Sequence, residues 1–250
     1  MIAGRHTNGG RSMKYEGVKW VWFDLDDTLI DFHANSRLAN AIIYREAGLD
    51  RYYATPEQWI EAYEGHNRLL WDRYSRGEIT QGFLRVDRFA TPLSPRWAGS
   101  REDLEAFCWR LDREYLDRLA EQTVMIDGAV EQLSRLRAHY NIGVLSNGFK
   151  EVQHRKLENT GLAPLVDLVV LSDDVGFNKP DLRIFAHAMK RAGEMDPQAH
   201  LMIGDNLAAD VGGAVRVGWR AIHFDRTQPG LRWRGSHIAI ANLKLLEGLL

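Results

Sequence analysis

Acidic side chains follow directly on a short apolar run near the start of the chain. Residues 20–23 are apolar, and Asp24 and Asp26 come next, two positions apart. A parallel strand that is buried on both faces is apolar throughout, and its carboxyl end is where open α/β sheets place ligands. Two carboxylates in one crevice repel each other unless a cation neutralises them, and such hard oxygen ligands suit Mg²⁺. The pattern therefore predicts a magnesium site, in which one carboxylate could also attack phosphorus.

A second apolar run ends in a hydroxyl group. Residues 142–145 lead into Ser146, which is followed by Asn147 and Gly148. Small side chains and free backbone N–H groups at a turn of this kind can bind a phosphate. The run therefore predicts a phosphate-binding turn at the end of another strand.

Two later segments supply a cation and further carboxylates. Lys179 lies in a loop that Pro180 constrains, where a fixed ammonium group can neutralise a phosphoryl oxygen. Residues 201–204 form a third apolar run, which ends in Asp205, and Asp210 follows. In chain order, the sequence thus offers a nucleophile, a hydroxyl group, a lysine and metal-binding acids.

The four segments together resemble the motifs of the haloacid dehalogenase superfamily. One such motif alone is weak evidence, whereas four in the right order at predicted strand ends are strong evidence. The resemblance covers nearly everything after Lys14. Within the superfamily, the chain is most similar to the pyrimidine-nucleotide 5′-nucleotidase group. The stretches that carry this closer similarity are residues 70–74, 77–80, 146–149 and 157–162.

The resemblance implies a role for each residue of these motifs. Asp24 would attack phosphorus to form an aspartyl phosphate, and Asp26 would protonate the leaving oxygen and then activate water. Mg²⁺ would bind Asp24, the backbone carbonyl of Asp26, and Asp205. Asp210 would orient bound water from just outside. The groups that bind the phosphoryl oxygens would be Ser146, the amide of Asn147, and Lys179.

Each of these residues also has a structural alternative. A turn rich in Asp and Thr can simply cap a helix, and for Asp27 we favour that interpretation. Ser146 can bond its own turn, Lys179 can be a solvated loop residue, and Asp210 can satisfy a helix N-terminus. Because all four motifs occur together, we favour the functional interpretation for these three residues and for both catalytic acids.

The segment between the first two motifs is predicted to be helical. Thr55 followed by Pro56 is typical of a helix start, and so is Ser100 with an acidic residue three positions later. Apolar residues then recur at helical spacing, and no strand-like alternation is visible. We expect an inserted all-helical cap domain here. The expected boundaries are residues 32–123 for the cap, and residues 14–31 and 124–250 for the core.

The rest of the chain alternates predicted strands with predicted helices, as a parallel sheet requires. The predicted strands are residues 142–146, 168–171, 201–203 and 219–224. The predicted helices are residues 36–47 and 80–89 in the cap and residues 130–136 and 182–192 in the core, with a closing strand and helix in 238–250. We therefore predict an α/β fold, a Rossmann-like parallel sheet core with an inserted all-helical cap.

The composition does not suggest binding to nucleic-acid polymers or membranes. The 250 residues are 45% apolar and carry a net charge of −2, so no charge excess favours such partners. The one cysteine, Cys108, excludes an internal disulfide and fits a reducing compartment, so we expect a cytoplasmic location. Residues 1–13 lack the apolar segment of a signal peptide, and we expect a flexible tail there, with Met13 as an alternative natural start.

The sequence gives less information about the substrate than about the fold or the reaction. In capped members of the superfamily the cap shapes the pocket for the leaving group, and aromatic side chains there can stack on a nucleobase. Helical spacing equally allows Trp71 and Tyr74 to be core residues of the cap. The candidate pocket residues are Phe32, His33, Trp71, Tyr74 and Phe83.

We therefore hypothesise a Mg²⁺-dependent phosphomonoesterase for a small phosphorylated metabolite, a nucleoside 5′-monophosphate with a pyrimidine preference. The main alternative is another phosphate ester, such as phosphoglycolate, a sugar phosphate or an acylneuraminate 9-phosphate. A haloacid dehalogenase would use the same nucleophile but would not need Asp26. A noncatalytic binding relative would be expected to lack the nucleophile, the acid or the lysine, and all three are present. The sequence does not indicate an oligomeric state.

Overall fold

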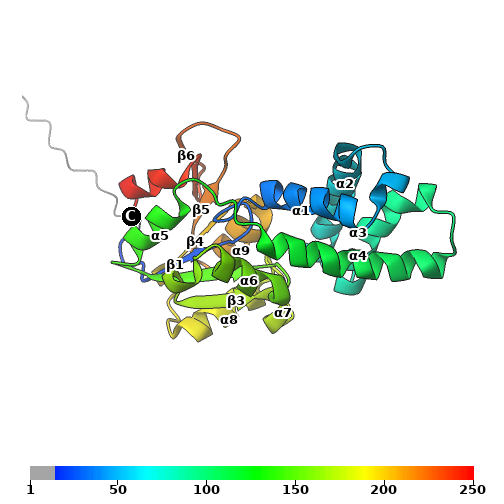
Figure 1. Cartoon of the computed structure of the whole chain (residues 1–250). Coiled ribbons are helices and arrows are strands. Elements are labelled where there is room, and N and C mark those ends of the chain that lie inside the picture. The colour runs from blue at the N-terminus through cyan, green and yellow to red at the C-terminus, as the bar shows by residue number, and fades with distance from the viewer. Residues whose placement is uncertain (1–14) are drawn as a thin grey trace, which may run out of the picture.

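The computed structural model describes residues 15–250 and shows a seven-stranded sheet with helices around it (Figure 1). The expected flexible tail at residues 1–13 lies outside the described residues. The strand order is β3-β2-β1-β4-β5-β7-β6, and every neighbouring pair is parallel except β6 with β7. The strands are β1 (Trp20–Phe23), β2 (Asn141–Ser146), β3 (Leu168–Leu171), β4 (His200–Gly204), β5 (Arg220–Phe224), β6 (Leu231–Trp233) and β7 (Ile238–Ile240).

Helices connect the strands along the chain. They are α1 (Phe32–Glu46), α2 (Pro56–Ser75), α3 (Gln81–Leu93), α4 (Arg101–Glu121), α5 (Ala129–Leu136), α6 (Lys150–Asn159), α7 (Ser172–Val175), α8 (Leu182–Ala192) and α9 (Gly213–Arg216). Short 3-10 helices lie at Leu49–Arg51, Ser94–Arg96, Ala163–Leu165, Pro197–Ala199 and Leu243–Gly248, and a π-helical turn at Leu207–Gly212. In the described part of the chain, no helix combines the length and the apolarity needed to cross a bilayer.

The sheet is buried on both faces because its central strands are apolar throughout. On one face, Leu133 of α5 and Leu157 of α6 belong to the apolar core that contains Val21 of β1. On the other face, Phe185 of α8 packs in a second core with Trp22. Gly143 lies beside Trp22 in the parallel register, and a Cβ atom at Gly143 would overlap the indole ring. Helices on both faces of a mostly parallel sheet confirm the predicted α/β, Rossmann-like fold.

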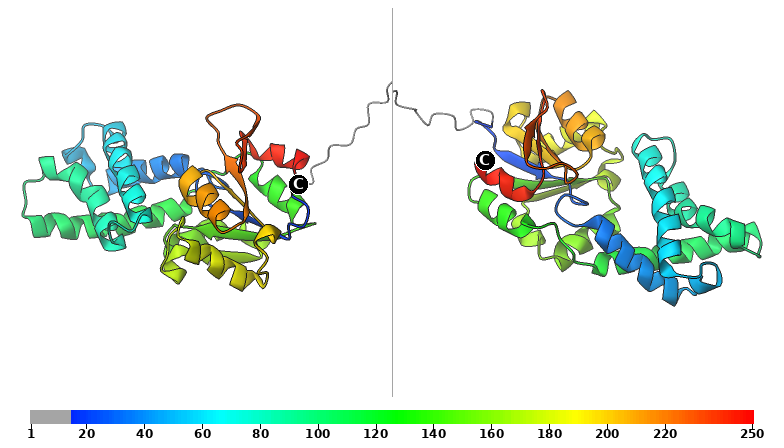
Figure 2. Two further views of the ribbon diagram at one scale, coloured as in Figure 1. Left: turned by 180° about the vertical axis from the view of Figure 1, so that it is seen from behind. Right: turned by 90° about the horizontal axis from the view of Figure 1, so that it is seen from above.

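Helices α1 to α4 lie together to one side of the sheet, as Figure 1 and both views of Figure 2 show. They share an apolar core, to which Val152 of α6 also contributes and in which aromatic rings stack against one another. The Tyr63 ring lies 5.2 Å from Phe89 and 5.3 Å from Tyr115 between centroids. Ring pairs at these distances stabilise a core beyond the area that they bury. This separate core explains how four helices can stand beside the sheet.

Both predicted helix starts are present. The Thr55 side chain accepts a hydrogen bond from the backbone N–H of Gln58, at 3.3 Å, at the start of α2. At the start of α4, Ser100 and Asp103 cap each other's backbone N–H groups in a capping box. These caps satisfy donors that the first helical turn leaves unpaired.

Several boundaries differ from the sequence-based predictions. α1 begins at Phe32 and not near residue 36, because Asp31 caps it by accepting from the N–H of Ala34. α6 was not predicted, since its polar residues show little apolar periodicity. β6 was not predicted either, because it is a short edge strand with mostly exposed side chains. The closing helix is the 3-10 helix Leu243–Gly248.

Candidate active site

Three neighbouring strands end at the same edge of the sheet. β1 lies between β2 and β4, and both pairings are parallel. Asp24 follows β1, Ser146 ends β2, and Asp205 follows β4. The backbone N–H of Asp24 still donates to the carbonyl of Ile203, at 2.9 Å, so the sheet fixes the backbone up to the first acid. Parallel topology therefore brings together residues that lie far apart in the sequence.

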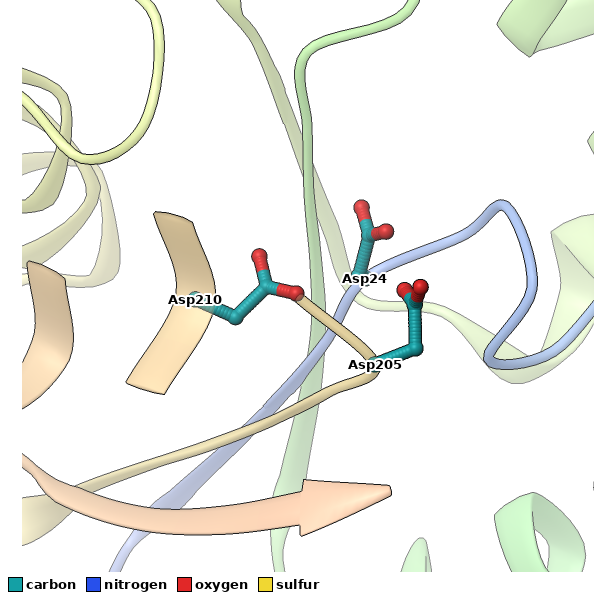
Figure 3. Close-up of side chains that lie close together, drawn as sticks. All are labelled: Asp24, Asp205 and Asp210. Atoms are coloured by element: carbon teal, nitrogen blue, oxygen red, sulfur yellow. The ribbon is translucent and has the colours of Figure 1, made fainter. Parts of the chain in front are cut away.

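Asp24, Asp205 and Asp210 bring their carboxyl groups together at this edge (Figure 3). One oxygen from each lies within 4.8 Å of the others. Asp210 comes from the π-helical turn after β4, and its carboxyl group fills the space that a Cβ atom at Gly204 would need. The Asp210 carboxylate also accepts from the N–H of Asn206, at 3.0 Å. The glycine before Asp205 is therefore required for the third acid to reach the cluster.

Lys179 is the cation of this cluster. Its side chain is 3% exposed, and its Nζ lies 2.7 Å from an oxygen of Asp24 and 2.7 Å from an oxygen of Asp210. The ammonium group also donates to the carbonyl of Leu145. The side-chain amide of Asn147 both donates to the carbonyl of Lys179 and accepts from its N–H, at 2.8 and 2.7 Å. The burial of Lys179 excludes a solvated loop lysine, and Asn147 fixes the loop that carries it.

The cluster holds more negative than positive charge, and its pKa values reflect this. Burial raises the pKa of Asp24 to about 7, with Lys179 acting in the opposite direction. Burial raises the pKa of Asp205 to about 8, and the charges of Asp24 and Asp210 add to the effect. Burial lowers the pKa of Lys179, but Asp210 and Asp24 outweigh it and hold that pKa above its ordinary value. Binding of a cation would therefore be favoured, with release of protons.

Asp26 is held by helix α6 and not by this cluster. Lys156 Nζ lies 2.7 Å from its Oδ1, and Gln153 Nε2 donates to its Oδ2 at 2.8 Å. The same Gln153 amide lies 2.8 Å from Ser146 Oγ. Gln153 and Lys156 were not predicted from the sequence. Their three-residue spacing, on a helix directly after the Ser146 turn, is the signal that could have indicated them.

Asp27 and Thr28 shape the loop after β1. Asp27 has a φ angle of +55° and accepts from the backbone N–H of His33, at 3.2 Å, which agrees with the expected capping role. Thr28 Oγ1 accepts from the N–H of Asp205 at 3.1 Å and donates to an Asp205 carboxyl oxygen at 3.3 Å. Thr28 was not predicted to be a site residue, whereas the structure shows that it orients Asp205.

A cavity of about 940 Å³ lies above the strand ends. Helix α2 contributes several lining residues from the opposite side, at the spacing of one helical face. Three of the five candidate pocket residues, Phe32, His33 and Trp71, line the cavity. All the predicted catalytic, phosphate-binding and metal-binding residues line it as well: Asp24, Asp26, Ser146, Asn147, Lys179, Asp205 and Asp210.

The other two candidates, Tyr74 and Phe83, are not among the lining residues, which corrects their assignment to the pocket. The Tyr74 ring packs edge-on against Trp71, with 5.7 Å between centroids, in the apolar core of the helices. Phe83 is 46% exposed at the start of α3, with the Arg73 guanidinium 5.9 Å from its ring centroid. Helical spacing predicts which residues share a face, but not which neighbour that face meets.

Comparison with known proteins agrees with this arrangement. Residues 18–218 match the sequence model of one family, described as haloacid dehalogenase-like hydrolases. The chain belongs to this family. The match spans every strand-end residue described above, from Asp24 to Asp210. The resemblance inferred from the sequence motifs is thus confirmed.

Among its relatives, this haloacid dehalogenase-like hydrolase is 33% identical over 214 residues to pyrimidine 5′-nucleotidase YjjG of Escherichia coli strain K12, covering 84% of this chain and 88% of that protein. It is 32% identical over 242 residues to phosphoserine phosphatase of Thermus thermophilus, covering 86% of this chain and 90% of that protein. A crystal structure of the HAD-hydrolase YfnB from Bacillus subtilis, bound to magnesium, superposes with a TM-score of 0.78 and 25% identity, covering 92% of this chain and 96% of that one.

The donor set of this haloacid dehalogenase-like hydrolase fits a hard divalent cation. The cluster consists of three carboxylates and contains neither cysteine nor histidine. Burial raises the pKa of two of these acids, Asp24 and Asp205, although Lys179 acts in the opposite direction, so a further positive charge would stabilise their ionised forms. Carboxylate oxygens at a partly open site are the ligands that Mg²⁺ takes when it also binds substrate phosphate.

Proposed function

We propose that this protein is a Mg²⁺-dependent phosphomonoester hydrolase that acts on nucleoside 5′-monophosphates and prefers pyrimidine bases. The observation that supports this most is the buried contact between Asp24 and Lys179, at 2.7 Å, beneath a cavity of about 940 Å³. A carboxylate beside an ammonium group meets two needs of phosphoryl transfer, a nucleophile and a cation for the phosphoryl oxygens. A cavity of this volume is large enough for a nucleotide.

In the proposed reaction, a carboxylate oxygen of Asp24 forms a bond to phosphorus while the bond to the leaving oxygen breaks. Asp26 gives that oxygen a proton, and the alcohol leaves. Water then attacks the phosphorus of the aspartyl phosphate and passes a proton to Asp26. This second step releases phosphate and restores both carboxyl groups. Two easier displacements thus replace one difficult one.

The phosphoryl oxygens would be bound by the turn after β2 and by Lys179. Ser146 Oγ and Asn147 lie at the cavity wall, and Lys179 Nζ is fixed by carboxylates on two sides. We assign Mg²⁺ to Asp24, Asp205 and the backbone carbonyl of Asp26, with Asp210 orienting bound water. When bound, the ion supplies positive charge that stabilises the transferred phosphoryl oxygens.

We assign the helical residues 32–123 to a cap domain, and residues 14–31 and 124–250 to the hydrolase core. The separate apolar core of α1 to α4 supports this division. In this arrangement the leaving group lies against the cap, where Phe32, His33 and Trp71 line the cavity. Trp71 offers an aromatic face for a nucleobase.

The nucleotide preference is supported by the similarity to YjjG, which is named a pyrimidine 5′-nucleotidase. A second candidate, another small phosphate ester, is supported by the similarity to a phosphoserine phosphatase at nearly equal identity. In either case the partner is a small phosphorylated metabolite. The single cysteine supports a cytoplasmic location, because it fits a reducing compartment.

The test is phosphate release by the purified full chain with Mg²⁺, against pyrimidine and purine 5′-monophosphates, phosphoserine, phosphoglycolate and sugar phosphates. We expect the highest kcat/KM with a pyrimidine nucleotide and no release in EDTA. Preference for another ester would retain the chemistry and change the substrate. No release from any ester would contradict the proposed function.

A further inference from the structure

We propose that Gln153 and Lys156 are positioning residues for Asp26, so that helix α6 holds the general acid of the reaction in place beside the phosphate-binding turn. This inference rests on the proposed phosphatase function, because it assigns a purpose to two residues that contact Asp26. Neither residue belongs to the four sequence motifs, and neither touches the carboxylate cluster.

Both oxygens of Asp26 are held, each by its own donor. Lys156 Nζ lies 2.7 Å from Oδ1, and Gln153 Nε2 lies 2.8 Å from Oδ2. A carboxylate held at one oxygen can still swing about that contact, whereas two donors from one rigid helix fix its plane. Proton transfer requires this accuracy, because a general acid must lie within hydrogen-bond reach of the leaving oxygen.

Gln153 also contacts the phosphate-binding turn. Its amide bridges Asp26 and Ser146 Oγ, so it links the acid directly to a phosphate-binding hydroxyl. A Cβ atom at Gly148 would overlap this amide, so the turn reserves space for it. The side-chain amide oxygen of Gln153, Oε1, is buried without a hydrogen-bond partner among residues 15–250. An unpaired buried oxygen costs stability, which favours a role for Gln153 in the site over a purely structural one.

Lys156 is a buried cation. Its side chain is 3% exposed and lies between Asp26 and the ring of Phe32, whose centroid is 5.2 Å from Nζ. The same helix packs into the core of α1 to α4 through Val152. A buried ion pair adds little stability compared with apolar residues of similar size. Fixing the carboxylate is therefore the better account of a lysine at this position.

Such a role predicts a dependence on the leaving group. A nucleoside 5′-monophosphate releases an alkoxide-like oxygen, which needs a proton, whereas p-nitrophenyl phosphate releases a stable phenolate, which does not. A misplaced Asp26 should slow formation of the aspartyl phosphate from the first ester much more than from the second. General damage to the site would slow both.

The experiment compares kcat/KM for uridine 5′-monophosphate and p-nitrophenyl phosphate, with Mg²⁺, in Lys156→Met and Gln153→Met. We expect kcat/KM for the nucleotide to fall roughly 100-fold and that for the aryl ester to fall less than about threefold, the pattern also expected of Asp26→Asn. The matched control is Lys150→Met, which removes a 60% exposed lysine of the same helix that pairs with Asp174. It should change neither value.

Equal losses for both esters in a variant that unfolds at the same temperature as the unaltered protein would overturn the positioning role, and so would no loss for either. If the unaltered protein prefers another alkyl phosphate, that ester replaces the nucleotide, and only the substrate assignment fails. If the unaltered protein hydrolyses neither kind of ester, the phosphatase function fails, and the positioning role fails with it.

Discussion

The strand ends of the sheet and the cavity face of α2 differ in how firmly their side chains are held. At the strand ends, Ser146, Lys179 and Asp210 are almost completely buried, and each has polar partners in the site. Along α2, Arg68 and Asp72 line the same cavity but are exposed. Groups that must stabilise a transition state benefit from fixed positions, whereas groups that bind a leaving group can gain their contacts from the substrate.

Several contacts join helices α1 to α4 to the part of the molecule that carries the strand ends. Asn178 donates to the carbonyl of Tyr74, at 3.2 Å, so the loop that carries Lys179 is bonded to the last turn of α2. Arg85 of α3 pairs with Glu151 of α6 at 2.8 Å. Changes in the helices can therefore reach the chemistry through polar bonds and through apolar packing against α6. Substitutions in the two regions should differ in size and in the kinetic constant that they change.

The largest effect is expected at the nucleophile. Asp24→Asn should lower kcat roughly 10⁴-fold or more, because an amide cannot form the covalent intermediate. Burial raises the pKa of Asp24 to about 7, so a neutral amide resembles the acid form that the fold already accepts, and the unfolding temperature should change little. Phosphate release and thermal unfolding measure the two quantities. Asp127→Asn, at an exposed acid, is the control, and retained turnover in Asp24→Asn would contradict the mechanism.

The next effect is expected at Lys179. Lys179→Met should lower kcat about 100-fold or more, since a fixed charge on the phosphoryl oxygens is lost. It should also lower the free energy of unfolding by about 3 kcal/mol, because removal of one partner leaves buried carboxylates unpaired. Urea titration and phosphate release measure these changes. Lys190→Met, at an exposed lysine of α8, should leave both unchanged. An unchanged stability in Lys179→Met would show that these contacts do not hold the cluster.

A smaller effect, mainly on KM, is expected in the helices. Trp71→Ala should raise KM for a pyrimidine nucleotide about tenfold, through the loss of base stacking, with a smaller change in kcat. Phe83→Ala should change KM less than twofold, because Phe83 does not line the cavity. Initial rates over a range of nucleotide concentrations measure both. Equal effects of the two substitutions would remove Trp71 from the binding site.

The smallest effect is a pH dependence of stability. Without metal, the folded state holds protons on Asp24 and Asp205, with pKa values of about 7 and about 8, that the unfolded state has already lost. The free energy of unfolding should therefore fall as pH rises from 6 to 8.5. Mg²⁺ needs the ionised acids, so its stabilisation of the folded state should be larger at the higher pH. Thermal unfolding with Mg²⁺ or EDTA at both pH values tests this, and an equal Mg²⁺ effect at both would contradict a site at these acids.

The same comparison explains which features could be predicted from the sequence. Asp24, Ser146 and Asp205 could be found because each ends an apolar run, and parallel strands end at one edge. The start of α4 could be found because its capping residues are local. These features depend on neighbouring residues or on a simple rule of topology.

Other features depend on contacts between distant segments. Lys156 reaches Asp26 across 130 positions of the chain, from a polar helix whose sequence shows no clear face. Tyr74 and Phe83 share helical periodicity with residues that line the cavity, but the Tyr74 ring packs against Trp71 and the Phe83 ring lies beneath the Arg73 guanidinium. The packing of whole elements decides such cases, and local spacing alone only suggests them.

The most direct test of the central claim is to trap the phosphoryl group. The full chain is mixed with p-nitrophenyl phosphate and Mg²⁺ and quenched in acid within one turnover, and the masses of its peptides are measured by mass spectrometry. The Asp26→Asn variant is treated in the same way, because hydrolysis of the intermediate should be slow in it. The account predicts one added phosphoryl group on the peptide that contains Asp24, and more of it in Asp26→Asn. Phosphate release without any modified peptide, or with the phosphoryl group on another residue, would contradict it.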